Sequence, residues 1–284
     1  MTETPDVRPY ITLYSDGTWE FADLEIPEPE PMPGGDPWAE AFNAGCPAEL
    51  LDTLTPSGSI IVSTAGAIIE DLDVTGTITV TANNVTIRNS RVIGGPRPIY
   101  VRSGITGLLV EFVTIHMPDE AGGGGAGVSG GGNNTVRYVL VTGRGDGLKA
   151  HSGSDYEFNR IRVSKPSGAS DHIDGIQGSG SSNYTIRGNY VDVPISTGQD
   201  GRVGNQGILI QASTGSNNKL VHDVVVEGNY FDGGGITVQV KPDGEFENVR
   251  FSGNTVGDNH EFTYLRGMDA PGVTWDDTNT LIGA

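Results

Sequence analysis

The chain has 284 residues, and its 17 basic and 36 acidic side chains give a formal net charge of −19. This excess of acid argues against nucleic acid and anionic membranes as partners, because phosphate groups are bound by Lys and Arg. No apolar run approaches the ~20 residues of a membrane-spanning helix, the first residues do not read as a signal peptide, and a single cysteine, Cys46, rules out an intrachain disulfide.

The first 25 residues predict a hairpin that serves as an attachment segment. Apolar and aromatic residues at 10–14 and 18–21 flank Ser15-Asp16-Gly17, as in two strands joined by a tight turn. An isolated hairpin is marginally stable, so we expect this one to dock on another surface. Five prolines within 26–37 then predict a stiff, extended linker.

Residues 38–51 predict a short helix, with Pro37 near its start. We expect this segment to cap the structure that follows. A cap is needed because the first coil of a stacked β structure would otherwise expose an apolar edge with unpaired backbone groups.

Residues 59–258 carry a repeat in which each unit supplies two short apolar strands. The first strand of each unit is expected at 60–62, 78–80, 99–101, 126–128, 148–150, 176–178, 208–210 and 236–238. After its first strand, each unit has a second segment with two apolar residues five positions apart. These pairs are Ile69 and Val74, Ile87 and Val92, Val110 and Ile115, Val136 and Val141, Phe158 and Val163, Ile186 and Val191, Val226 and Phe231, and Phe251 and Val256.

Short strands that recur at this spacing, with no helical periodicity between them, predict an all-β solenoid of about eight coils. Successive coils stack ~4.8 Å apart, which brings like residues together. Asn189, Asn229 and Asn254 fall in one column, so their amides are expected to hydrogen-bond along the stack. The alternative is that each Gly-Asn pair only forms a turn.

Three stretches carry a family resemblance: residues 54–60 (LTPSGSI), 84–92 (NVTIRNSRV) and 174–177 (DGIQ). They resemble the single-stranded right-handed parallel β-helix of the pectate-lyase-like superfamily, and most closely the β-helix repeat proteins of actinobacteria and phages, which include minor tail and tail-fibre proteins. The resemblance covers about 54–258. The residues divide the chain into a hairpin at 1–25, a linker at 26–37, a capped β-helix at 38–258 and a C-terminal cap or subunit contact at 259–284.

Two acids stand at equivalent positions of neighbouring coils. Asp146 and Asp174 each precede a glycine at the start of a first strand, and Gln206 and Gly234 are expected to continue the column. Two stacked carboxylates repel each other, so the pKa of one rises unless a cation lies between them. Ca²⁺ is one candidate for that cation, with Asp146 and Asp174 as ligands.

Other titratable and amide side chains surround this pair. Paired acids suit glycoside hydrolysis, and a His or Lys beside a carboxylate could serve as the base of a polysaccharide lyase. The structural alternative is that Asp-Gly forms a turn at a coil corner and that the carboxylate accepts backbone N–H groups. The catalytic candidates are Asp146, Asp174, Lys149, His151 and His172, and the ligand-binding candidates are Gln177, Gln206 and Gln211.

The resemblance implies a phage virion component made in the host cytoplasm, a minor tail protein or tail fibre that attaches to other tail proteins through its N-terminal segment, contacts a host-surface glycan and forms a homotrimer. The alternative is a polysaccharide lyase or glycoside hydrolase. The enzyme motifs of the superfamily are largely missing, since the only Asp-Asp is Asp276-Asp277, outside the repeat.

The net charge favours a neutral glycan, and Trp19, Trp38 and Trp275 lie outside the predicted coils, so no aromatic sugar platform is evident. The insertions at 194–205 and 212–222 are candidate recognition loops.

Overall fold

The computed structural model describes residues 9–13, 19–23, 35–121, 124–166, 168–195, 202–212 and 220–283. The chain forms two compact units, Met1–Asp36 and Pro37–Ala284. None of the described helices is long and apolar enough to cross a membrane.

The first unit contains the predicted hairpin. Strand β1 (Pro9–Leu13) pairs antiparallel with β2 (Trp19–Asp23), and Leu13 lies opposite Trp19. The turn between the strands and residues 24–34, which include most of the predicted linker, lie outside the described residues. The docking of this hairpin therefore stays a prediction.

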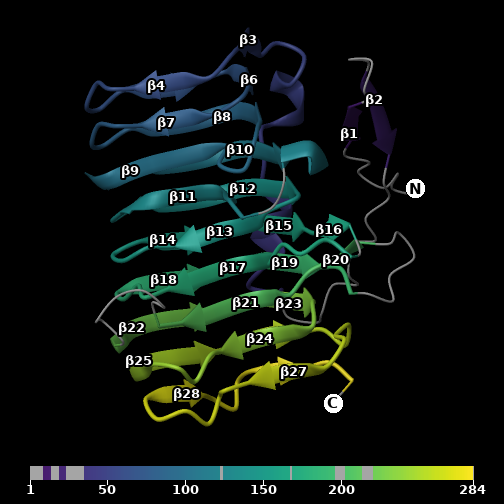
Figure 1. Cartoon of the computed structure of the whole chain (residues 1–284), viewed down its shortest axis with the longest axis vertical. Helices are drawn as coiled ribbons and strands as arrows, with labels where there is room; N and C mark the ends of the chain where they lie inside the picture. The colour runs from purple at the N-terminus through teal and green to yellow at the C-terminus, as the bar shows by residue number, and fades with distance from the viewer. Residues whose placement is uncertain are drawn as a thin grey trace. The chain divides into compact units, whose positions relative to one another are not determined.

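The second unit is a parallel β-helix whose strands stack one above another (Figure 1). A nine-stranded sheet takes one strand from each coil, so the stack has nine coils where about eight were expected. Its strands in chain order are β4 (Ile60–Val62), β7 (Ile78–Val80), β9 (Ile99–Thr106), β11 (Ala126–Gly132), β13 (Asp146–Ala150), β17 (Asp174–Ser179), β21 (Gln206–Gln211), β24 (Ile236–Val240) and β27 (Thr263–Arg266).

A sixteen-stranded sheet forms the other side of the coils. Its strands are β3 (Thr55–Ser57), β5 (Ile68–Glu70), β6 (Leu72–Thr75), β8 (Thr86–Ile93), β10 (Leu109–Met117), β12 (Thr135–Gly143), β14 (Asp155–Glu157), β15 (Arg160–Val163), β18 (Tyr184–Arg187), β19 (Tyr190–Val193), β22 (Leu220–Glu227), β23 (Tyr230–Gly233), β25 (Glu245–Ser252), β26 (Thr255–Val256), β28 (Val273–Trp275) and β29 (Thr280–Leu281). A small antiparallel pair, β16 (Lys165–Pro166) with β20 (Arg202–Val203), lies outside both sheets.

The apolar columns predicted from the repeat form the core between the sheets. Ile87 pairs with Ile69 on one side and Val110 on the other, and Ile87 and Val110 are fully buried. One predicted unit is two residues out of register, because Tyr156 and Ile161, not Phe158 and Val163, occupy these columns. A shift of two residues keeps a side chain on the same face of a strand, so the apolar pattern alone could not detect it.

The same two-residue error affects two first strands. Val128 aligns with Ile99, and Val238 aligns with Ile208, where the sequence analysis used residues 126 and 236. Gln206 therefore lies opposite Ile236, not Gly234.

The coils also continue beyond Val256, so the prediction that the β-helix ends at 258 is wrong. Strands β27, β28 and β29 add to β24, β25 and β26 in parallel. The ring of Trp275 lies 5.6 Å from the ring of Phe251 in the preceding coil, centroid to centroid. The segment 259–284 thus contributes a coil, and its role as a subunit contact stays a prediction.

Residues 38–51 form two short 3₁₀-helices, η1 (Ala39–Asn43) and η2 (Ala48–Leu50). Helix η1 contacts β12 and β19, and Trp38 packs on Tyr190 and Tyr230, so η1 lies along the side of the stack and does not cap the first coil. Aromatic burial against these tyrosines stabilises η1 in this position. Ile61 and Ile68, in the first coils, are 74% and 54% exposed.

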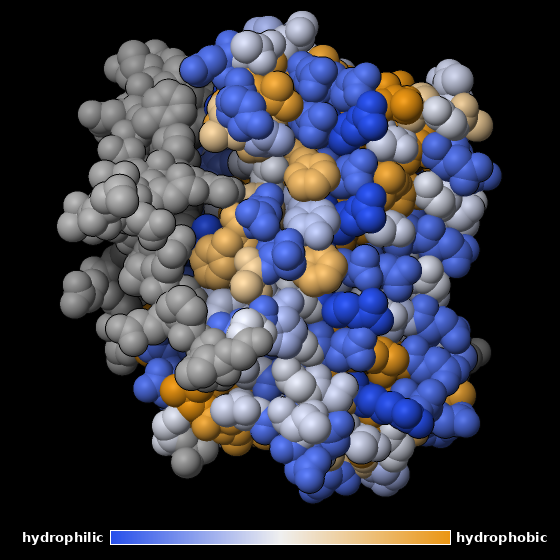
Figure 2. All heavy atoms as spheres, turned by 180° about the vertical axis from the view of Figure 1, so that it is seen from behind, coloured by the Kyte–Doolittle hydropathy of each residue, from blue (hydrophilic) through white to orange (hydrophobic). Residues whose placement is uncertain are grey.

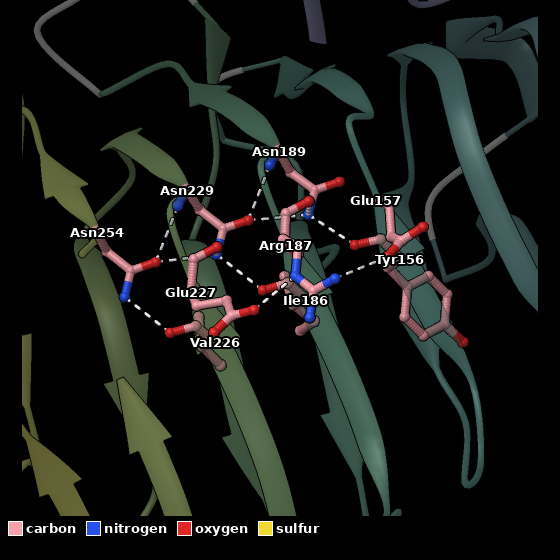
Figure 3. Close-up of polar contacts among 9 residues, drawn as sticks. All are labelled: Tyr156, Glu157, Ile186, Arg187, Asn189, Val226, Glu227, Asn229 and Asn254. Carbon is pink, nitrogen blue, oxygen red and sulfur yellow. Dashed lines mark hydrogen bonds and ion pairs between the residues drawn. The ribbon is translucent and has the colours of Figure 1, made fainter. Parts of the chain in front are cut away.

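An asparagine ladder runs through the buried edge of the later coils (Figure 3). In each of its steps the side-chain Nδ2 donates to the Oδ1 of the next Asn at 2.9 Å, and in the steps drawn it also donates to a backbone carbonyl oxygen. The predicted column is confirmed and is longer than expected. Its members are Asn159, Asn189, Asn229, Asn254 and Asn279.

The outer surface of the sixteen-stranded sheet carries a column of alternating charge. Arg187, for example, lies between Glu157 and Glu227 and forms an ion pair with each (Figure 3). On the face seen in Figure 2, strongly hydrophilic side chains follow one another along the stack. The column consists of Glu70, Arg88, Glu111, Arg137, Glu157, Arg187 and Glu227.

Candidate functional site

Asp146 and Asp174 meet where their strands, β13 and β17, enter the nine-stranded sheet, as the sequence predicts. The backbone N–H of Asp174 donates to Oδ1 of Asp146 at 2.8 Å, and both carboxylates are buried. We call Asp146, Lys149, His172, Asp174 and Gln177 the acid corner.

The glycine after each acid lets the two sheets approach closely at this point. A Cβ on Gly147 would lie 2.4 Å from Cγ2 of Ile161, and a Cβ on Gly175 would lie 2.3 Å from Cγ1 of Val191. Neither glycine has a positive φ. The two glycines therefore serve close packing of the two sheets. The structural alternative is supported in part, because the Asp146 carboxylate accepts a backbone N–H, that of Asp174.

Lys149 and Gln177 connect the two acids. The Lys149 ammonium forms an ion pair with Oδ2 of Asp146 and donates to Oε1 of Gln177. The Gln177 amide in turn donates to Oδ2 of Asp174 at 2.9 Å. These bonds place a cation beside the carboxylate pair, so the protein supplies the neutralising charge itself.

The electrostatics of the corner follow from burial. Loss of solvation, and next the neighbouring Asp174 carboxylate, raise the pKa of Asp146 to about 6. Nδ1 of His172 lies 3.2 Å from Oδ2 of Asp174, and this hydrogen bond raises the pKa of His172. The His172 side chain is 54% exposed, so it is the member of the corner that solvent reaches most readily.

The remaining candidates are not all part of the corner. Nε2 of His151 accepts the backbone N–H of Gly130 at 2.8 Å, and burial lowers the pKa of His151, so this imidazole is held in its neutral form. Gln206 lies next to Asp174 in the column. Gln211 lies at the far end of the same strand, with Nε2 3.5 Å from Oγ of Ser179. His151 and Gln211 therefore have structural partners away from the acids.

The corner does not fit a Ca²⁺ ion. Ca²⁺ takes 6–8 oxygen ligands, whereas an ammonium and a backbone N–H already bind the two oxygens of Asp146. Among the described residues, no group of three or more His, Cys, Asp or Glu side chains is placed to hold a metal.

A groove of about 360 Å³ adjoins the corner at Gln206, and the sequence analysis did not find it. Residues far apart in the chain line it, and one of them, Phe262, is 73% exposed. In the sequence, the only signal of this groove was an aromatic residue, Phe262, in a segment with no predicted strand. The lining residues are Lys165, Val203, Gly204, Asn205, Gln206, Gly235, Ile236, Glu261, Phe262 and Arg266.

The coils also carry aromatic side chains that the sequence analysis did not expect to act together. The rings of Phe112, Tyr138 and Phe158 stack in successive coils, with centroids 5.0 and 5.4 Å apart. All three residues have a positive φ, so they stand at the same bend of each coil. The rings cover one another's faces, which makes this stack a structural feature and a poor sugar platform. The prediction that all three tryptophans lie outside the coils is wrong for Trp275, which lies within a coil.

Comparisons with known proteins agree with the architecture. No curated protein matches the chain. A solved tailspike protein, gp49 from Acinetobacter baumannii bacteriophage Fri1, a capsular polysaccharide depolymerase, is similar at a TM-score of 0.27 and 11% identity, over 79% of this chain and 63% of that one. The chain thus spans less than two thirds of that tailspike. The model of the right-handed β-helix region matches residues 72–256, more than half of the sequence. The chain therefore belongs to the right-handed β-helix family.

Proposed function

We propose that the chain is a component of a phage tail, a minor tail protein or tail fibre, whose β-helix contacts a glycan of the host surface. The sequence resemblance to phage-encoded β-helix tail proteins supports this assignment. The separate N-terminal unit supports attachment to other tail proteins, because a two-stranded hairpin gains stability by docking.

The observation that favours binding over cleavage is that both carboxylates of the acid corner are buried and bound by neighbouring side chains. Lys149 neutralises Asp146, and Gln177 and His172 both bind Asp174. A retaining or inverting glycosidase needs carboxyl groups that reach the glycosidic bond and its water. Both acids are instead buried, and their partners stabilise the stack.

The repeated ladders support a mechanical role as well. Hydrogen bonds connect asparagines of five coils, and ion pairs connect charged residues of neighbouring coils. Such contacts between most neighbouring coils make a rigid scaffold on which loops can present binding residues.

The test is to ask whether the chain is part of the particle and whether it binds the host. Mass spectrometry of purified particles should detect it, and the purified full-length chain should bind host envelopes and compete with phage adsorption. Absence from particles together with no binding to envelopes would refute the proposal. Sedimentation would separately test the proposed homotrimer.

A polysaccharide lyase or hydrolase is the second candidate, and one observation favours it. His172 combines a buried carboxylate partner with an exposed imidazole, and such a pair can act as a general base. Release of unsaturated sugars or reducing ends from host glycan, abolished by His172→Gln and by Asp174→Asn but not by His222→Gln, would establish it. His222 is the matched control because it also pairs with an aspartate, Asp223, on another part of the surface.

A further inference from the structure

The groove beside Gln206 has a sugar-sized volume and a mixed lining. Its 360 Å³ or so falls at the lower end of the ~300–1,000 Å³ typical of small-molecule sites. Its lining includes the first residues of β21 and β24 and the residues just before β27, in the coils that follow the acid corner, together with Arg266 at the end of β27. The proposed function holds that the chain binds a glycan, and on that basis the lining residues indicate which kind of sugar the groove can bind.

Phe262 supplies an apolar surface that is held in place. Its backbone N–H donates to the carbonyl oxygen of Gly235 at 2.9 Å. The edge of the ring lies over the same glycine, since a Cβ there would be 3.1 Å from Cε2. The ring is therefore supported from below and open to solvent above, the arrangement in which the apolar face of a sugar packs on an aromatic ring.

Gln206 supplies an unused hydrogen-bonding group. It is 8% exposed, and its Oε1 is a buried oxygen without a hydrogen-bond partner among the described residues. A buried polar atom without a partner costs about 1–3 kcal/mol, so a hydroxyl donor that reaches it would be bound favourably. Gln206 lines the groove, which makes a ligand hydroxyl a suitable donor.

The charges in the groove oppose those of the whole chain. Lys165 and Arg266 line it together with one acid, Glu261. Arg187 is engaged by two glutamates on the outer sheet, whereas exposed Arg266 forms no ion pair or hydrogen bond with any described residue. Lys165 donates to the carbonyl oxygen of Asp171 and keeps further N–H donors.

We propose that this groove binds an acidic sugar, a hexuronic acid residue of a host glycan. The sugar ring packs on Phe262, its carboxylate is bound by Arg266 and Lys165, and a hydroxyl donates to Gln206. The net charge of −19 favoured a neutral glycan, but charges beyond the ~8 Å Debye length are screened at physiological ionic strength, so the local cations decide.

A matched pair of probes tests the proposal: cellobiouronic acid, which carries a glucuronic acid, and cellobiose, in which that carboxylate is a hydroxymethyl group. Ligand-observed NMR and calorimetry with the full-length chain should show the acidic disaccharide binding more tightly. Arg266→Gln should remove this preference by weakening the acidic probe about tenfold or more, as expected for a hydrogen-bonded charge. Phe262→Ala should weaken both probes.

Arg250→Gln is the control, because Arg250 is also exposed and forms no ion pair with a described residue, but it does not line the groove. This variant should bind both probes as the parent does. Equal binding of the two probes by the parent chain, or an acidic preference that survives Arg266→Gln, would overturn the inference. Binding to host envelopes is measured in parallel. If it persists in Phe262→Ala and Arg266→Gln, the groove is not the glycan site although the proposed function holds. If the parent shows none, the glycan-binding part of the proposed function fails.

Discussion

The asparagine ladder and the acid corner use the same geometry for opposite purposes. Both place like residues at equivalent positions of successive coils. An amide donates and accepts, so Asn229 bonds its neighbours on both sides and the column propagates through the stack. Carboxylates only accept, so Asp146 and Asp174 form a pair that needs Lys149 and cannot be extended. A column of identical polar side chains is therefore favourable for amides, which complement themselves, and not for carboxylates.

The difference also explains which region could bind a ligand. The amides of the ladder are buried and satisfied by one another and by backbone oxygens. At the edge that carries the acid corner, the column changes from Asp174 to Gln206 to Ile236. Oδ1 of Asp174 and Oε1 of Gln206 are buried there without a hydrogen-bond partner among the described residues. Interrupted columns, not continued ones, leave groups available for recognition.

The largest effect is expected when a carboxylate replaces an amide of the asparagine ladder. Asn229→Asp should lower the free energy of unfolding by about 3–5 kcal/mol at neutral pH, because it leaves an uncompensated charge in a buried site. Asn229 Nδ2 would no longer donate to Asn254 and Ile186. Urea unfolding followed by circular dichroism measures the change.

Asn83→Asp is the matched control for that variant, since exposed Asn83 uses only its Oδ1, as acceptor of the Thr106 N–H. It should change the unfolding free energy by less than about 0.5 kcal/mol. Equal effects of the two variants would contradict a special role for the ladder.

The second largest effect is expected from disrupting the close packing of the two sheets beside the acid corner. Gly175→Ala should destabilise the fold by about 1–3 kcal/mol, because the new methyl group overlaps Val191 and the carbonyl oxygen of Gly207. Gly58→Ala is the control, because nothing lies within 4 Å of a Cβ there. Thermal unfolding of both variants should separate them, and an unaffected Gly175→Ala would show that the sheets can move apart.

The buried charge of the corner predicts a pH dependence. Since the pKa of Asp146 is raised to about 6 in the folded chain, its contribution to stability falls as the pH rises from the unfolded value of about 4 through 6. Between pH 4.5 and 7.5 this group should cost the fold about 2 kcal/mol. Asp146→Asn should flatten that part of the profile. Asp232, whose pKa burial also raises to about 6, contributes a slope of the same sign that remains in the variant. An unchanged profile in Asp146→Asn would mean that Lys149 keeps Asp146 ionised.

The smallest effect is expected on the surface. Arg187→Gln removes two ion pairs of the outer charge column, but its side chain is about half exposed, so the loss should be about 0.5 kcal/mol. The difference from the parent should shrink in 1 M salt, because exposed ion pairs are screened. A salt-independent loss would point to packing of the Arg187 stem instead.

Much of the fold could be predicted from the sequence because stacking repeats one physical requirement in every coil. Apolar residues such as Ile87 and Val110 recur at fixed places in each unit, and the repeated Gly-Asn at Asn229 and Asn254 marks the ladder. The adjacency of Asp146 and Asp174, and the shared column of Lys149 and Gln177, followed from the same alignment.

The errors have two causes. Phe158 was placed in the core column that Tyr156 occupies, since strand periodicity cannot tell positions two residues apart. Asn159 and Asn279 were missed as ladder members because they follow Phe158 and Thr278 in place of the repeated glycine.

The sequence by itself determined that the chain winds into stacked parallel coils, because an apolar pattern repeated unit after unit can be buried only by neighbouring units. Only the tertiary structure decided what lies beside the coils: the 38–51 segment along the flank, His172 against Asp174, and Phe262 over Gly235 near Gln206. These contacts join residues from different units, or from outside the repeat. Their positions depend on loop geometry and side-chain packing, which leave no periodic signal in a sequence.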